Sequence, residues 1–427
     1  MNHKLGNLFK GDKVIWMIFF ILCLVSIVEV FSASSFLTFH GGSYWGPLIK
    51  HTFYILIGLG AMICVLNIPC KYFKIATLPL LALSFVMLIA VFIIGSTTNG
   101  AQRWIDLGFV QFQPSEIAKG ALVLAVAQIL SGMQTDNGVD KKAFWWVLGT
   151  SAFIVLPILL ENFSTAALIS AVIFLMMFIA QVPLSQLGKL IGVVAAGVVL
   201  VIVLTLALGQ DQSETAAAEN ETAKTELVEE SATQQAAADA EATPQRRHGL
   251  LHRFDTWKSR IMKFTSGKEI TPKDYDLDKD AQVAHANIAI IKSNVIGRGP
   301  GNSEERDFLS QAFSDFIYAI IIEETGIEGA AIVAMLYVFL FWRAGRIARA
   351  CANTFPAYLA MGIGLLLVIQ AMFNMMVAVG LVPVTGQPLP LISKGGTSTI
   401  INCIYIGMLL SISKSAKKRE AVSKVTK

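Results

Sequence analysis

The residues of this sequence best suited to chemistry are acidic side chains at the edge of an apolar stretch. Asp315 lies near the start of the string FSDFIYAIIIEETG, and Glu323 and Glu324 follow it. In a helix the two glutamates would lie roughly 12 Å beyond Asp315. Burial at an apolar boundary raises the pKa of a carboxyl group and suits it to accept a proton. Aspartate in front of an apolar helix is also a common N-cap, and the pattern by itself favours the cap.

A further acid, Glu116, is followed three residues later by Lys119 at the start of another apolar stretch. This spacing places both side chains on one face of a helix, close enough to pair. Ionisable residues inside apolar segments are costly, so each is a candidate for function. The pattern is equally compatible with a structural ion pair and with a role in substrate binding.

The elements that must position these residues are membrane-spanning helices. Of the 427 residues, 54% are apolar and 15% are charged, against about 25% charged in soluble domains. A span needs about 20 mostly apolar residues. Ten candidate spans meet this length: 14–32, 51–69, 73–95, 115–132, 144–160, 163–181, 186–208, 315–342, 355–381 and 395–413. Only Glu161 and Asn162 separate the fifth from the sixth, so these two could instead form one bent helix.

The orientation of the spans follows from the basic residues of the short loops. With the N-terminus in the cytoplasm, the inner segments carry seventeen Lys and Arg residues and the outer short loops carry three. Such an excess indicates the cytoplasmic side. The sequence therefore predicts an all-α polytopic membrane protein with ten transmembrane helices, both termini cytoplasmic, and a large extracytoplasmic loop between helices 7 and 8.

The predicted domain organisation has four parts. Residues 1–208 hold helices 1–7, residues 209–314 form the large loop, residues 315–413 hold helices 8–10, and residues 414–427 form a basic cytoplasmic tail. Within the loop, 209–245 is acidic, without aromatic residues, and typical of a disordered tether. The part at 246–314 mixes basic and aromatic residues, which suits either an amphipathic stretch on an anionic membrane or a solvated loop.

Other ligand chemistry receives little support from the sequence. None of the five cysteines lies in the large loop, so no disulfide framework is expected. His248 and His252 are four residues apart but lack partner ligands, so no metal site is predicted there. Nothing in the composition predicts nucleic-acid binding.

Two polar connections share the outer side with Asp315. Residues 99–119 read NGAQRWIDLGFVQFQPSEIAK and include Arg103 and Gln113. Residues 380–398 read GLVPVTGQPLPLISKGGTS, whose prolines and glycines predict a re-entrant segment or a tightly folded lid. Non-helical backbone at membrane depth must line a cavity or pack against protein. Together with the Gly-rich segment at 297–303, these connections predict an outward-facing cavity.

Four motifs in this order resemble the SEDS family, which includes FtsW, RodA and SpoVE. VFSASS follows the first span, and NGAQRWIDLG…FQPSEIAK resembles the family's NGARRWI…QPSE-AK loop. GNS…FLSQAFSDFIYAIIIEETG resembles GNS…LPEAHTDFIFA-I-EE-G, and LVPVTGQPLPLISKGGTS resembles LLPVTGLPLPFISYGGSS. The resemblance covers nearly all of the chain outside 209–245, and the stretch before Glu323 favours the FtsW-like branch over the RodA-like branch.

The resemblance implies a ten-span enzyme that polymerises lipid II into peptidoglycan glycan strands. Asp315 matches the family's essential aspartate, the expected general base, and this outweighs the N-cap interpretation. The resemblance further implies substrate-binding positions at Arg103, Gln113, Glu116, Lys119, Thr385, Ser393 and Lys394. Positions with a structural or functional role are expected at Glu323, Glu324, Pro383, Pro388, Pro390, Gly395 and Gly396.

The implied reaction has a polyprenyl pyrophosphate leaving group and a sugar hydroxyl as acceptor. No protein metal site is expected, although a divalent cation, Mg²⁺ or Mn²⁺, could act at the pyrophosphate. The implied partners are a class B penicillin-binding protein, other divisome or elongasome proteins, lipid II and membrane lipids. The expected location is the cytoplasmic (inner) membrane of a bacterium.

The sequence departs from the family at three places. The family's PDLGTA is replaced by Glu161-Asn162-Phe163-Ser164-Thr165-Ala166, Lys394 stands where tyrosine is usual, and Phe313 replaces a histidine. No catalytic role is therefore expected at Asn162. Two other functions stay open: a flippase for lipid-linked precursors, and a non-enzymatic scaffold of the division machinery. Neither alternative requires a carboxylate at position 315.

Overall fold

The computed structural model describes residues 10–41, 45–98, 101–106, 111–136, 138–208, 280–309 and 314–425. Its helices are α2 (Lys13–Gly41), α3 (Gly46–Asn67), α4 (Lys71–Ile94), α5 (Pro114–Gly132), α6 (Lys141–Glu161), α7 (Phe163–Ile179), α8 (Leu184–Leu208), α11 (Asp280–Lys292), α12 (Ile317–Ala350), α13 (Thr354–Ala378) and α14 (Thr397–Val425). A single 3-10 turn, η1 (Glu305–Asp307), follows α11. The all-α prediction is confirmed, and the ten predicted spans coincide with α2–α8 and α12–α14.

Eight of these helices are long and apolar enough to cross a membrane in the described part of the chain. The helices at the predicted sixth and seventh positions contribute shorter apolar stretches, Phe163–Ile179 and Leu184–Ala196. The fifth and sixth predicted spans are separate helices, because Asn162 caps α7 and its Oδ1 accepts a hydrogen bond of 3.2 Å from the Thr165 backbone N–H. The protein is thus a multi-pass membrane protein.

Two short sheets complete the described secondary structure. The strands β1 (Ser96–Thr98), β2 (Ala101–Asp106) and β3 (Gln111–Phe112) form an antiparallel sheet in the order β1-β2-β3. In it Ile105 pairs with Phe112 and Asp106 with Gln111. The strands β4 (Gln134–Thr135) and β5 (Gly138–Val139) form a hairpin at the opposite end of α5. The strands β2 and β3 of the first sheet lie within the predicted polar connection 99–119.

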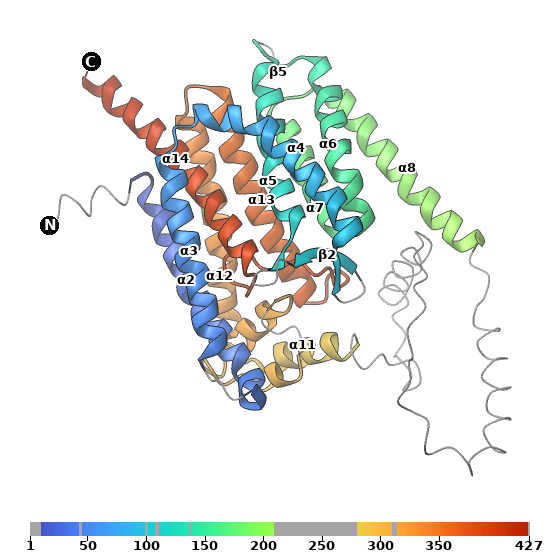
Figure 1. Cartoon of the computed structure of the whole chain (residues 1–427), viewed down its shortest axis with the longest axis vertical. Helices are drawn as coiled ribbons and strands as arrows, with labels where there is room; N and C mark the ends of the chain where they lie inside the picture. The colour runs from blue at the N-terminus through green and yellow to red at the C-terminus, as the bar shows by residue number, and fades with distance from the viewer. Residues whose placement is uncertain are drawn as a thin grey trace. The chain divides into compact units, whose positions relative to one another are not determined.

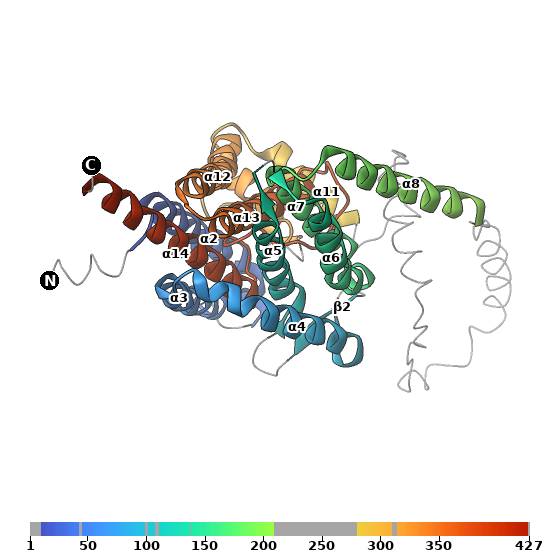
Figure 2. The same ribbon diagram turned by 90° about the horizontal axis from the view of Figure 1, so that it is seen from above.

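The helix α5 lies in the interior of the bundle with α13 beside it (Figures 1 and 2). Pairs that pack closely are α3 with α14, α12 with α13, α4 with α5, and α13 with both α5 and α7. The α5 side chains are buried on almost every face, which its small residues permit: a Cβ on Gly120 would collide with the Tyr405 ring. Because α5 follows the connection that carries Arg103, this burial anchors that connection to the core.

The helix α12 is kinked at Gly326, where φ is 73° and ψ is −177°. A Cβ at this position would collide with the Val295 carbonyl oxygen, so that glycine is required for both its conformation and its space. Backbone carbonyls near the kink accept hydrogen bonds from the loop that precedes α12. The N–H groups of Arg298 and Gly299 donate to the carbonyl oxygens of Glu323 and Glu324 at 3.0 and 2.8 Å.

The predicted loop and tail are described only in part. The acidic segment 209–245 and the basic, aromatic residues of 246–279 lie outside the described residues, so their predicted character stays a prediction. From residue 280 the loop forms α11 and then η1. The predicted basic tail continues α14 as helix to Val425. The described residues 185–208 of α8 belong to a different unit from the other described helices.

Candidate active site

Asp315 and Arg103 meet beside a glycine of the predicted lid. A Cβ built on Gly386 would lie 2.9 Å from Arg103 Nη1 and 3.6 Å from Asp315 Oδ2. The guanidinium and the carboxylate therefore face the same small space, although they are 212 positions apart in the sequence. Gly386 has a φ of 70°, a backbone conformation that favours glycine. Asp315 and Arg103 are both partly exposed.

Asp315 precedes α12 without being its N-cap. Phe316 occupies the N-cap position and makes no side-chain capping bond. The Asp315 carboxylate accepts a hydrogen bond of 3.0 Å from Ser314 Oγ, and its backbone carbonyl accepts one of 2.9 Å from Asn374 Nδ2 on α13. The N-cap interpretation that the sequence pattern favours is therefore wrong, and the backbone at Asp315 is fixed from α13.

The predicted lid, residues 380–398, is non-helical as far as Gly396, where α14 follows, and is bonded to polar side chains of α7, α12 and α13. Ser393 Oγ donates to the Ser314 carbonyl at 2.7 Å, and Gln387 Nε2 donates to Thr165 Oγ1 at 2.6 Å. Asn374 Nδ2 also donates to the Gln387 carbonyl at 2.8 Å, and Tyr337 on α12 donates to the Pro390 carbonyl. Three of these bonds satisfy backbone carbonyls that have no helical partner, those of Ser314, Gln387 and Pro390.

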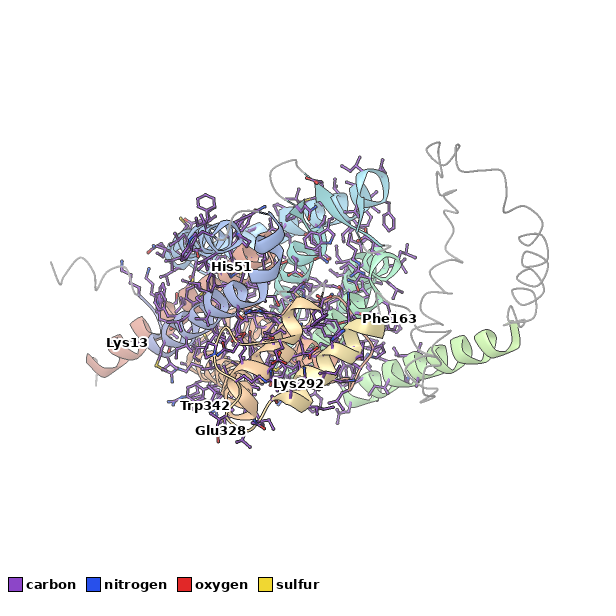
Figure 3. The ribbon with its side chains drawn as sticks, turned by 90° about the horizontal axis from the view of Figure 1, so that it is seen from below. Lys13, His51, Phe163, Lys292, Glu328 and Trp342 are labelled. Carbon is purple, nitrogen blue, oxygen red and sulfur yellow. The ribbon has the colours of Figure 1, made fainter. Side chains whose placement is uncertain are left out.

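The N-terminal helices hold the lid from its other side. Ser26 Oγ on α2 donates to the Ile392 carbonyl at 2.7 Å and lies 2.7 Å from His51 Nε2 on α3. Because the single hydroxyl proton is used by the carbonyl, His51 must donate through Nε2. His51 is labelled in Figure 3 and is buried. The lid thus joins parts of the chain that are far apart in sequence.

Glu116 and Lys119 form the ion pair that their spacing predicts. Lys119 Nζ lies 2.8 Å from Glu116 Oε1, and their side chains are 0% and 1% exposed. Lys119 also donates to Gln370 Oε1 at 2.7 Å, and Gln370 Nε2 donates to the Pro388 carbonyl at 3.1 Å. Tyr405 donates to the Glu116 carbonyl at 2.5 Å. The pair connects the start of α5 to the lid through α13.

The remaining predicted substrate-binding residues are Gln113, Thr385 and Lys394. Gln113 is buried at the start of α5, and its Nε2 donates to Ser115 Oγ at 3.0 Å. Thr385 is a buried neighbour of Gly386, and its hydroxyl has no hydrogen-bond partner in the described part of the chain. Burial lowers the pKa of Lys394, and the positive charge of Lys50 lowers it further. Pro383 and the Gly395-Gly396 pair belong to the same non-helical lid.

Glu323 and Glu324 serve a different region from Asp315. The Glu323 carboxylate accepts from Ser303 Oγ at 2.5 Å and from the Glu304 N–H at 3.0 Å. The Glu324 carboxylate accepts from Ser32 Oγ and from the Gly301 N–H at 3.0 Å. Both glutamates are fully buried. They hold the Gly-rich segment 297–303 against α12.

Sequence reasoning did not single out the neutral polar residues that bind the lid. Gln370 and Asn374 lie one turn apart inside the apolar α13, and Gln387 and Ser314 lie within two of the quoted motifs. A search for ionisable groups passes over amides and hydroxyls. A search for any polar side chain inside an apolar helix would have found Gln370 and Asn374.

No protein metal cluster is present among the described residues, since no three His, Cys, Asp or Glu side chains converge there.

Comparison with known proteins gives consistent similarities over almost the whole chain. The pattern of the FtsW/RodA/SpoVE family, described as a cell cycle protein, matches residues 12–224 and 249–418. A probable peptidoglycan glycosyltransferase FtsW of Saccharophagus degradans is 30% identical over 91% of this chain and 89% of its own length. The corresponding FtsW of Coxiella burnetii is 28% identical over 93% of this chain and 95% of its own.

Two solved structures share the fold. The rod shape determining protein RodA of Thermus thermophilus has a TM-score of 0.60 at 20% identity, covering 96% of this chain and 98% of its own. A chain from a peptidoglycan synthase complex, solved in a study of how polymerization and crosslinking are coordinated, has a TM-score of 0.65 at 21% identity. That match covers 95% of this chain and 98% of its own.

Proposed function

This chain belongs to the FtsW/RodA/SpoVE family and is a peptidoglycan glycosyltransferase, and we propose that Asp315 is its general base. The observation that carries the proposal is the meeting of the Asp315 carboxylate and the Arg103 guanidinium at Gly386. Glycosyl transfer from a pyrophosphate donor needs a base for the acceptor and positive charge for the leaving group. This pair supplies both.

The proposed chemistry is the transfer of a glycan from a lipid-linked pyrophosphate to a sugar hydroxyl of lipid II. Asp315 accepts the proton of the attacking hydroxyl, the new glycosidic bond forms, and the bond to the pyrophosphate breaks with inversion at the donor carbon. A second carboxylic acid is unnecessary because pyrophosphate leaves readily, whereas a glycosidase must protonate a poor leaving group. The membrane holds both lipid-anchored substrates near one depth, which favours their encounter.

Arg103 is the cation that we assign to the pyrophosphate. Its planar guanidinium can donate two parallel hydrogen bonds to phosphate oxygens. Lys119 is fully buried and donates to Glu116 and Gln370, so we assign it to positioning the lid. A divalent cation, Mg²⁺ or Mn²⁺, would add charge stabilisation at the pyrophosphate when bound. Thr385, Ser393 and Lys394 belong to the lid that we expect to contact the glycan or the pyrophosphate.

We further propose a transpeptidase partner and a bacterial inner-membrane location. One structural neighbour is a chain of a peptidoglycan synthase complex that joins polymerization to crosslinking. A class B penicillin-binding protein would crosslink the strands made here, alongside other divisome or elongasome proteins. The positive-inside pattern of the short loops supports an active site on the outer face of the cytoplasmic membrane.

The test is polymerisation of labelled lipid II by the purified full-length protein, with its cognate transpeptidase and divalent ions. We expect Asp315→Asn to lower glycan synthesis by about 10²–10⁴-fold, the usual contribution of a positioned general base. Glu328→Gln is the matched control, because Glu328 is an exposed acid of the same α12 helix, labelled in Figure 3.

The controls separate the possible failures. Equal thermal stability of the two variants shows that lost activity is not lost folding. Wild-type-like polymerisation by Asp315→Asn would remove Asp315 as the base. Absence of polymer from the wild type, with partner and ions present, would favour the flippase or scaffold function instead.

A further inference from the structure

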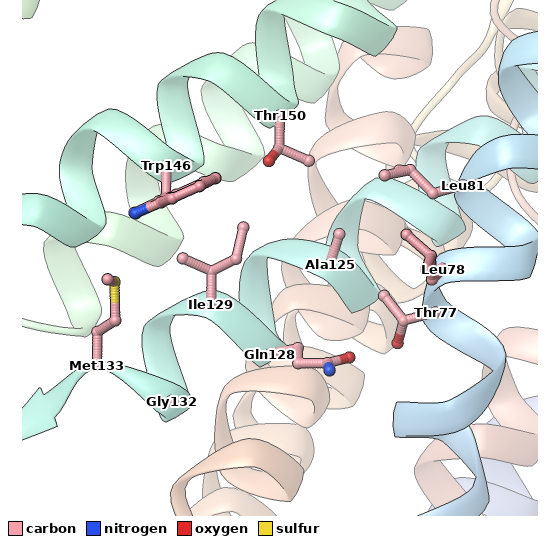
Figure 4. Close-up of a pocket in the computed structure, with 10 residues that line it drawn as sticks. All are labelled: Thr77, Leu78, Leu81, Ala125, Gln128, Ile129, Gly132, Met133, Trp146 and Thr150. Carbon is pink, nitrogen blue, oxygen red and sulfur yellow. The ribbon is translucent and has the colours of Figure 1, made fainter.

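A second site lies at the opposite end of α4, α5 and α6 from Arg103. A groove of about 400 Å³ opens between these three helices, and Figure 4 shows the side chains that line it. The α5 wall includes Ile129, Gly132 and Met133, where that helix ends. Leu78 lies near the start of α4 and Trp146 near the start of α6. The volume lies within the range of about 300–1,000 Å³ that small-molecule sites show.

The walls of the groove are suited to an alkyl chain. Its lining is dominated by Leu78, Leu81, Ala125, Ile129 and Met133. All of these residues but Met133, the C-cap of α5, belong to helices that are long and apolar enough to cross a membrane. The Trp146 ring lies along one wall, with its nitrogen toward Met133 in Figure 4. An indole with one apolar face and one N–H donor is typical of the boundary between lipid tails and headgroups.

The charges on the first turns of α4 and α6, next to the lining residues in sequence, are positive. Lys71 and Lys74 occupy the first turn of α4, and Lys141 and Lys142 begin α6; all four are exposed. Lys74 precedes Leu78 by four residues, and Lys142 precedes Trp146 by four, so each lysine lies on the same helix face as a lining residue. Lys74 Nζ also lies 5.1 Å from the centre of the Phe355 ring, which keeps it near the bundle.

Two aspartates and the ends of the helices also contribute charge at this end of the groove. Asp136 and Asp140 lie in the same region, and Asp140 Oδ1 is used to cap α6 by accepting from the Lys142 N–H at 2.9 Å. Four lysines against two aspartates leave the mouth positive. Two of the three helices also present their N-termini there, whose partial positive charge favours an anion. A basic mouth above an apolar groove between membrane helices is the pattern of an anionic lipid site.

We propose that this groove binds one acyl chain of an anionic diacyl phospholipid whose headgroup is held by Lys74 and Lys142. In the predicted topology this lipid belongs to the cytoplasmic leaflet, on the other side of the membrane from Asp315. The proposal is independent of the polymerase reaction, because it uses none of the residues placed at that site.

The test is native mass spectrometry of the full-length protein, titrated with phosphatidylglycerol or with phosphatidylcholine of the same chains. The key variant is Gly132→Leu, since a Cβ at Gly132 meets open space and the added side chain would fill the groove. Its matched control is Gly149→Leu on α6, where a Cβ also meets open space but the residue does not line the groove.

We expect one tightly held phosphatidylglycerol on the wild type and on Gly149→Leu. Gly132→Leu should weaken this binding at least about tenfold, the equivalent of two methylene groups losing contact. Lys74→Gln and Lys142→Gln should each lower the preference for phosphatidylglycerol over phosphatidylcholine by roughly fivefold. Lys13→Gln, an exposed lysine at the start of α2, is the control for charge alone.

Three results would overturn the proposal. Equal binding by Gly132→Leu and Gly149→Leu would show that lipid does not occupy this groove. Equal binding of the two headgroups by the wild type would remove the anionic preference. Displacement of the phospholipid by a polyprenyl phosphate would identify an isoprenoid occupant instead. The lysine variants change exposed positions, so they keep the test decisive if Gly132→Leu does not fold.

Discussion

Two acidic regions on the same segment of chain, eight residues apart, are built in opposite ways. Asp315 lies just before α12, is partly exposed, and shares a small space with Arg103 beside the lid. Glu323 and Glu324 lie within α12, are fully buried, and each accepts two hydrogen bonds from hydroxyl or N–H groups of neighbouring segments. The sequence presents all three as acids in one apolar string.

The difference lies in what surrounds each carboxylate. A buried carboxylate is stable only when donors replace its lost hydration, and the donors that do so are then fixed in place. Glu323 and Glu324 therefore act as a clamp on the segment 297–303. A carboxylate that substrate can reach, next to a cation, can instead exchange a proton during a reaction. Substitutions that convert acids to amides test this distinction directly.

The largest effect is expected at the buried ion pair of α5. Lys119→Met leaves Glu116 without its cation in a site from which water is excluded, and this should lower the free energy of unfolding by about 3–5 kcal/mol. Thermal unfolding in detergent measures the loss. The double variant Glu116→Gln/Lys119→Met removes both charges and should recover most of it. A Lys119→Met protein of normal stability but without polymerase activity would place this lysine at the substrate.

The clamp on α12 should show the next largest effect. Glu323→Gln replaces one acceptor oxygen by an NH₂ group facing donors, so at least one of the bonds from Ser303 and Glu304 is lost. We expect the free energy of unfolding to fall by about 1–3 kcal/mol. The specific activity of the folded fraction should stay close to that of the wild type. A stable but inactive Glu323→Gln protein would erase the distinction between this acid and Asp315.

The contact between the lid and the active site should show a smaller effect. Gly386→Ala introduces a Cβ 2.9 Å from Arg103 Nη1 and strains a φ of 70° by about 1–2 kcal/mol. We expect glycan synthesis to fall roughly tenfold as Arg103 is displaced. Gly396→Ala is the matched control: its φ is 49°, but the nearest side-chain atoms, on Tyr54, are 3.9 Å away. Similar losses in both variants would assign the effect to backbone strain alone.

The smallest effect is expected at the exposed charges of α11. Lys292, labelled in Figure 3, lies 2.6 Å from Glu305 Oε1, and His285 Nδ1 lies 2.7 Å from Glu305 Oε2. Burial alone would raise the pKa of Glu305, but the bonds from Lys292 and His285 outweigh it and leave the pKa lowered. A lowered pKa in the folded state stabilises the protein fully above the ordinary value of 4.5, and this stabilisation is lost as the pH falls from 4.5 through the lowered pKa.

The melting temperature measured between pH 6 and pH 3 tests this sign. Lys292→Gln should flatten the loss of stability on acidification, and added salt should reduce the difference from the wild type. If the melting temperature of Lys292→Gln falls with pH as steeply as that of the wild type, other acids control the loss of stability at low pH.

The helices and one contact of the site follow from local sequence features. Long apolar stretches predict the spans because a chain inside a bilayer must satisfy its own backbone hydrogen bonds. The i,i+3 spacing of Glu116 and Lys119 predicts their ion pair because both lie on one turn of one helix. Asn162 separates α6 from α7 because its side chain can cap a helix.

The assembly of the site could not be read in the same way. Arg103, Asp315 and Gly386 belong to three distant segments, and their meeting depends on how α5, α12 and α13 pack. The pattern favours Asp315 as an N-cap, yet Phe316 takes that position. Gln370 and Asn374 are neutral, so no charge or spacing in the sequence marks them as part of the site. Their amides nevertheless hold the lid and the backbone at Asp315.

The sequence by itself determined the membrane helices and their predicted orientation, because these depend on hydrophobicity and on the charge of short loops. It also determined the motifs that resemble the family, because each motif is made of residues close along the chain. Only the tertiary structure decided which acids are clamped and which faces a cation. It also decided which of two lysines is buried: Lys119 is enclosed and bonded to Glu116 and Gln370, while Lys74 stays exposed. The physical reason is that hydration and partner donors are supplied by segments far apart in the sequence, so burial is a property of packing.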